Sequence, residues 1–171
     1  AALLADLTAG AYTAQVKVLP GAASGIALME IYEDGGAASA KLKNLSMRGL
    51  IRSGGAVIVG FAVGGTTPKK VLVRAIGPTL ATFGVAGVLS DPRLVVMRGD
   101  TPVAANDNWG DVQAATGTLV AAARGVGAFS LPLSSRDAAA LPTLAPGAYT
   151  AVIEGVGTVS GIVLVEVYEV P

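Results

Sequence analysis

The stretch PGAYTAVIEGVGTVSGIVLVEVYE, residues 146–169, has a counterpart near the start of the chain, where residues 9–33 read AGAYTAQVKVLPGAASGIALMEIYE. The two copies are offset by 137 residues before their internal loop and by 136 residues after it. The long segment between them is not repeated. Any prediction of fold or function must therefore explain why one chain carries the same piece at both ends.

Each copy has the pattern of two β-strands joined by a turn. Tyr12, Val16 and Val18 alternate with polar residues in the first copy, and Tyr149 and Ile153 do so in the second, which is the period of a half-buried strand. The second half of each copy, IALMEIYE or IVLVEVYE, is apolar on both faces, as in a strand that is covered on both sides. Glycine-containing loops separate the halves, so each copy is predicted to be a β-hairpin.

The remaining sequence predicts an all-β fold. Short apolar runs interrupted by Gly and Pro predict strands at residues 41–51, 56–63, 70–76, 94–98, 102–105 and 128–133, and a helix at residues 111–124. We expect an antiparallel β-sandwich, immunoglobulin-like or jelly-roll-like, with an N-terminal β-hairpin appendage and one short helix. The predicted domains are residues 1–35, the hairpin that pairs with another subunit or module, and residues 36–171, the sandwich.

Composition narrows the function. Among 171 residues there are 12 basic and 12 acidic side chains, no Cys and no His. No basic field attracts nucleic acid, and thiolate nucleophiles, Cys/His zinc sites and histidine general bases are excluded. No uncharged run is long enough for a membrane-spanning helix, so membrane insertion is not expected. The Ala-rich start AALLADL, without Met, suggests a removed leader or a piece of a longer polypeptide, and we expect an extracellular or cell-surface location.

One loop offers oxygen ligands. Asn106, Asp107, Asn108 and Asp111 lie within six residues of one another, and Ca²⁺ binds carboxylate and amide oxygens. The alternative is a turn in which Asx side chains bond their own backbone. Calcium is the single candidate cofactor. Trp109 in the same loop is either a sugar-stacking platform or a core residue.

Charged residues also occur inside predicted strands. Glu30 and Glu166 hold matching positions in the two copies on mostly apolar faces, and Arg74 has apolar neighbours. A buried carboxylate needs a partner. We expect a structural ion pair between Glu166 and Arg74, or alternatively Arg48, and an equivalent arginine for Glu30 across an interface.

Two segments resemble known proteins. The stretch DPRLVVMRGDTPVAANDNWG followed by LAPGAYTAVIEGVGTVSGIVLVEVYE resembles the bacterial pre-peptidase C-terminal domain family. Residues 40–170, with NLSMRG and VLVRAIGPTLATFGV, resemble a repeat module of large secreted β-sandwich proteins of bacteria. The resemblance implies an exported sandwich with a binding, targeting or structural role and no catalysis.

The duplication itself suggests a role in assembly. A lone hairpin is marginally stable in water, so the first copy needs a partner: its own sandwich, the next chain, or a neighbouring module of a tandem array. Addition to the next chain would build a filament. The function predicted from sequence is a non-enzymatic subunit of an extracellular self-assembling fibre, a homopolymer joined head-to-tail by strand addition. Its expected contact residues are Tyr12, Val16, Val18, Leu28, Ile31 and Tyr32. The alternative is an adhesive or carbohydrate-binding module of a multi-domain surface protein, with polysaccharide as partner.

Overall fold

The structure is a computed structural model that describes residues 1–171 except residues 24, 34–40 and 112. The chain divides into two compact units, Ala1–Leu42 and Lys43–Pro171, which are described separately below. The boundary predicted between residues 35 and 36 falls outside the described residues, so the predicted domain limits stay a prediction.

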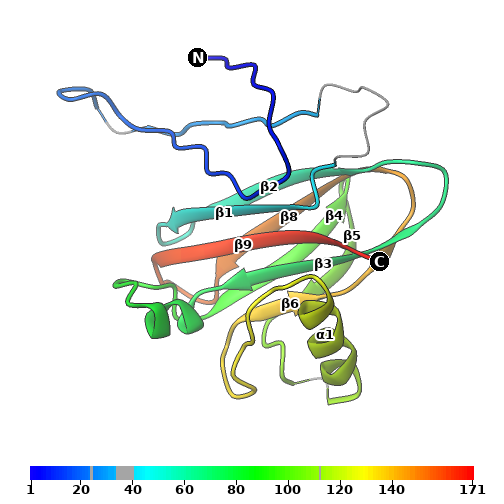
Figure 1. Cartoon of the computed structure of the whole chain (residues 1–171). Coiled ribbons are helices and arrows are strands. Elements are labelled where there is room, and N and C mark those ends of the chain that lie inside the picture. Colours follow the sequence, from blue (N-terminus) through cyan, green and yellow to red (C-terminus); the bar gives the residue numbers. More distant parts are fainter. Residues whose placement is uncertain (24, 34–40, 112) are drawn as a thin grey trace. The chain divides into compact units, whose positions relative to one another are not determined.

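The unit Lys43–Pro171 consists of two antiparallel sheets (Figure 1). In the first sheet the order is β1 (Asn44–Ile51), β9 (Gly161–Val170), β3 (Lys69–Ile76) and β6 (Ala138–Ala140), with β7 (Thr143–Leu144) also paired to β3. In the second the order is β2 (Ala56–Val63), β8 (Gly147–Gly155), β4 (Pro92–Arg98) and β5 (Thr101–Asn106). The predicted all-β antiparallel sandwich is confirmed.

The core lies between the two sheets, because inward-facing and outward-facing side chains alternate along each strand. In β8 the inward side chains of Tyr149, Ala151 and Ile153 are buried, and in β9 Val163 and Val165 face them from the other sheet. Full burial of a Val or Ile side chain contributes about 1.5–3 kcal/mol. The apolar alternation seen in the sequence therefore marks the residues that hold the sheets together.

The second copy of the repeat is not a hairpin, and this corrects the sequence prediction. β8 pairs with β2 and β4, whereas β9 pairs with β1 and β3, so each is a central strand of a different sheet. The loop 156–160, with a turn at residues 157 and 158, therefore connects one sheet to the other. Leu89 is fully buried beside the start of β9, where its backbone N–H donates to Ile162 O at 2.8 Å.

The segments that connect the strands also differ from prediction. A 3-10 helix, η1 (Pro78–Phe83), follows β3, and α1 (Gln113–Gly125) confirms the expected helix with shifted ends. Residues 128–133 form no strand; Phe129 O instead accepts a hydrogen bond from Arg74 at 2.6 Å. Of the helices in the described residues, none has the length and apolar character needed to cross a bilayer.

The described part of Ala1–Leu42 contains no paired strands, and the hairpin that pairs with another subunit or module stays a prediction. Residues 11–18 and 26–33 run out and back around a turn, where Ala22 N–H donates to Leu19 O at 3.0 Å (Figure 1). The physical reason is that two strands alone bury too little surface to offset the loss of backbone entropy.

Candidate functional site

A buried ion pair lies on the outer face of the first sheet. Arg74 on β3 lies opposite Glu166 on β9 in the strand register, and its Nε and Nη2 donate to Glu166 Oε2 at 2.8 and 2.5 Å. Their side chains are 2% and 6% exposed. The structure thus brings together the two residues that the sequence hypothesis paired. Arg48 is exposed on the same face and lies opposite Leu164.

Further contacts satisfy this pair. Arg74 Nη1 donates to Phe129 O, and the guanidinium lies 4.6 Å from the centre of the Phe129 ring, a cation–π geometry. Tyr168 donates from its hydroxyl to Glu166 Oε1 at 2.9 Å. Both carboxylate oxygens of Glu166 are therefore occupied, which is the arrangement that makes a buried charge pair tolerable.

The hydroxyl of Tyr168 responds to the same surroundings. Burial raises the pKa of Tyr168 to about 12, and the charge of Glu166 and the hydrogen bond to it act in the same direction. Arg74 and a hydrogen bond with Ser46 lower the pKa of this hydroxyl by a smaller amount. Tyr168 therefore stays protonated at neutral pH and serves as a donor to Glu166.

A second, smaller core covers this face beneath α1. Trp109 is 4% exposed and packs with Leu72, Leu119, Ala139 and Tyr168. Its indole Nε1 donates to Pro132 O at 3.0 Å and to Ser135 Oγ at 3.2 Å. Of the two alternatives for Trp109, the core residue is the one the structure shows, so this indole offers no stacking surface for a sugar.

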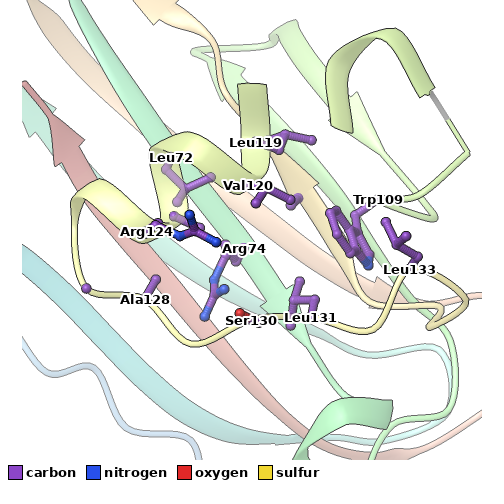
Figure 2. A pocket seen from close by; sticks show the side chains of 13 residues that line it. Leu72, Arg74, Trp109, Leu119, Val120, Arg124, Ala128, Ser130, Leu131 and Leu133 are labelled. Carbon is purple, nitrogen blue, oxygen red and sulfur yellow. The ribbon is translucent and has the colours of Figure 1, made fainter. Parts of the chain in front are cut away.

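Two cavities flank α1. One, of about 420 Å³, lies between α1, β3 and the loop 126–133 (Figure 2). The other, of about 450 Å³, shares its Trp109, Leu119 and Ala139 wall. In Figure 2, Trp109 and Leu133 lie at one end of the first cavity and Arg74 and Arg124 toward the other.

The chemistry available in the first cavity is limited. Its described lining is mostly apolar and offers two guanidinium groups and the Ser130 hydroxyl, with no carboxylate, thiol or imidazole. One of those guanidinium groups, that of Arg74, already binds Glu166 and Phe129 O. A serine without a base is not an activated nucleophile. The lining described can accommodate an apolar group.

Asp137 is a buried anchor that sequence reasoning missed. Its Oδ1 accepts the backbone N–H groups of Gly77 and Thr79 at 2.8 and 3.3 Å, and its Oδ2 accepts the Thr79 hydroxyl. These bonds tie the start of η1 to β6. The available signal was an acidic residue immediately before the apolar run AAA at 138–140. Asp137 holds the fold and does not face a cavity.

Several side chains of the predicted calcium loop already form hydrogen bonds within the protein. Asn106 Oδ1 accepts Ala139 N–H at 2.9 Å, and Asn106 Nδ2 donates to Asn108 O. Asn108 Nδ2 donates to Asp111 Oδ2 at 3.1 Å, while Asp107 is exposed. Among the described residues no group of three or more acidic, His or Cys side chains is placed to hold a metal. Asn108 Oδ1 is buried without a partner, so calcium binding stays a prediction.

The first copy of the repeat exposes what the second copy buries. Tyr12 is 56% and Tyr32 80% exposed, whereas the matching Tyr149 and Tyr168 are 4% and 9% exposed. The other expected contact residues are exposed as well: Val16, Val18, Leu28 and Ile31. Tyr32 donates to Glu30 Oε1 at 2.9 Å, which repeats the Tyr168–Glu166 bond, and this hydrogen bond raises the pKa of Tyr32.

Comparisons with known proteins give one distant likeness. The structure is similar to the pre-peptidase C-terminal domain of a collagenase from Bacillus anthracis, with a TM-score of 0.44 and 12% identity over 73% of this chain and 89% of that one. No family model matches the sequence, and no curated protein matches it. The resemblance to this family is therefore partial.

Proposed function

We propose that this chain is a non-catalytic structural module, a β-sandwich that is joined to a further sandwich through residues 1–33. One observation carries the proposal. Residues 9–33 have the sequence of two central, buried strands, yet Tyr12, Val16 and Tyr32 are exposed in the structure. Apolar segments that repeat the sequence of a core and lie open to solvent are a surface for a partner.

The chemistry of the chain supports a structural role. The sequence contains no Cys or His, and the buried ion pair between Arg74 and Glu166 is satisfied on both sides. A reactive group in an active site is held ready for substrate, whereas this pair serves the packing of β3 against β9. The proposal includes an extracellular or cell-surface location, as expected from the sequence.

The fibre form of the proposal has residues 1–33 entering the sandwich of the next chain. The central positions of the sandwich Lys43–Pro171 are already taken by its own β8 and β9. A neighbour's strands could add only at the sheet edges, which are β1 and β6 with β7 in the first sheet and β2 and β5 in the second. The structure therefore supports a module of a multi-domain protein better than a homopolymer, although both join sandwiches in series.

The adhesive or carbohydrate-binding alternative has less support. Sugar recognition by stacking needs an exposed aromatic ring, and Trp109 is buried under α1. The exposed tyrosines, Tyr12 and Tyr32, belong to the strands that we assign to the joining of sandwiches.

A shortened chain tests the proposal. Identical full chains can join only at the sheet edges, and by this route we expect the full chain to associate in sedimentation velocity, in proportion to concentration. A chain of residues 36–171 should remain monomeric with an unchanged melting temperature. Negative-stain images separate the two forms: filaments would favour the fibre, and discrete particles the module. Equal association of both chains would refute a joining role for residues 1–33.

A further inference from the structure

The duplication extends further than its most similar part. With the same offset of 137 residues, Ala1 and Ala2 correspond to Ala138 and Ala139, and Leu4 and Leu7 to Leu141 and Leu144. The first copy therefore covers the region of β6 and β7 as well as β8 and β9. Residues 1–33 match the whole C-terminal part of the sandwich, residues 138–169.

In the sandwich these elements depend on neighbours from the rest of the unit. β8 lies between β2 and β4, and β9 lies between β1 and β3, while β6 and β7 lie at the side of β3. Every strand outside this part that pairs with it comes from residues 44–106. A copy of residues 138–169 without a copy of residues 44–106 has no strand to pair with, and the described part of residues 1–33 is unpaired accordingly.

A glycine in the first copy is explained only by such a neighbour. Gly161 begins β9, and a Cβ there would overlap the backbone of Val88 and Leu89. The matching residue is Gly25, around which a Cβ would meet nothing within 4 Å. In this structure nothing near Gly25 requires a glycine. A sandwich in which a Leu89-like loop lies against it would.

The carboxylate of Glu30 indicates the same neighbouring sandwich. Glu166 is held by Tyr168 on one oxygen and by Arg74 on the other. Glu30 keeps the tyrosine bond, to Tyr32, and holds the matching strand position. A strand equivalent to β3 would bring an arginine to its second oxygen, and a charge-assisted pair of this kind is selective for that register.

We infer that residues 1–33 are the β6–β9 part of a second sandwich of this same fold, whose β1–β5 and α1 come from another stretch of like sequence. The partner is thus the front part of another module, which residues 1–33 complete as two central strands in opposite sheets. This inference rests on the proposed function and names its partner.

A tandem protein tests it. Residues 41–137 are placed directly before Ala1 of the full chain, so that Ala1 takes the position of Ala138. Hydrogen exchange is measured by mass spectrometry on peptides from residues 11–18 and 26–33. Central strands exchange through global unfolding, so we expect exchange at least about 100-fold slower than in the 171-residue chain. Equal exchange in the two proteins overturns the inference.

Two substitutions test which side chains of residues 11–18 face the core of the second sandwich. Ala14 matches Ala151, which faces the core with 0% exposure, and Gln15 matches Val152, which faces outward and is partly exposed. Ala14→Asp should abolish the slow exchange in the tandem protein and leave the melting temperature of the 171-residue chain unchanged. Gln15→Asp, with the same change of charge, should keep the slow exchange. Equal effects of both would overturn the assignment.

If the tandem protein does not fold, a replacement within one chain tests the same inference. Here residues 138–169 are exchanged for residues 1–33, and we expect a cooperative unfolding transition with buried Trp109 fluorescence. A chain that shows neither overturns the inference. If truncation abolishes association but the tandem peptides stay unprotected, this inference fails while the proposed function stands. Equal association with and without residues 1–35 removes the proposed function itself.

Discussion

Substitution of Arg74 by methionine removes the positive member of the buried pair and keeps most of the side-chain volume. Arg74 makes two hydrogen bonds to Glu166 Oε2 and one to Phe129 O. In Arg74→Met the carboxylate of Glu166, with a side chain 6% exposed, would keep the Tyr168 hydroxyl as its donor. Breaking such a pair from one side costs about 3–5 kcal/mol, because an uncompensated charge stays buried.

The cost converts into a measurable shift. For a domain of this size 1 kcal/mol moves the melting temperature by roughly 3–5 °C, so Arg74→Met should lower it by roughly 9–25 °C. Chemical denaturation followed by the fluorescence of Trp109, the single tryptophan of the chain, measures the free energy directly. Arg48→Met is the matched control, since Arg48 is exposed on the same face of the sheet, and it should change stability by less than about 0.5 kcal/mol.

A second substitution separates charge from packing. Adding Glu166→Gln to Arg74→Met removes the stranded charge and should recover about 1–3 kcal/mol, although Glu166→Gln alone destabilises the protein. The reasoning is refuted if Arg74→Met costs no more than Arg48→Met. It is also refuted if the double variant is less stable than Arg74→Met alone.

Three further outcomes follow from the structure. The pKa of Tyr168 is about 12 in the folded protein and 10.0 in a free tyrosine. The protonated hydroxyl therefore adds its full contribution to the free energy of unfolding below pH 10, and this contribution is lost as the pH rises toward 12. In urea denaturation across this pH range, the free energy of unfolding of Tyr168→Phe should fall less steeply than that of the unaltered protein, and an identical slope would contradict the assignment. Gly161→Ala should lower the free energy of unfolding by more than about 3 kcal/mol, because the new Cβ would overlap the backbone of Val88 and Leu89. Gly25→Ala should leave the melting temperature unchanged. Similar effects at both positions would argue against the packing described. Millimolar Ca²⁺ should leave the melting temperature unchanged, because the side chains of residues 106–111 are largely bonded to one another and to β6; a rise that a chelator reverses would establish the calcium site.

Prediction from sequence reached the pairing of Arg74 with Glu166 but not the role of Asp137. The first is visible because two charged residues interrupt strands whose other positions are apolar, and a buried charge requires its opposite. Asp137 bonds to Gly77 and Thr79, which lie 60 and 58 residues away in the chain. No local pattern indicates which backbone N–H groups a carboxylate will accept.

The sequence by itself determined that this protein is an all-β sandwich, which residues of β8 are buried, and that residues 1–33 repeat its last part. Alternation carries this information because neighbouring side chains of a strand point to opposite faces. Only the tertiary structure decided that β8 and β9 lie in different sheets. Backbone N–H and C=O groups are the same in every strand, so the choice of pairing partner depends on packing between residues that are distant in the sequence, such as Leu89 and the start of β9.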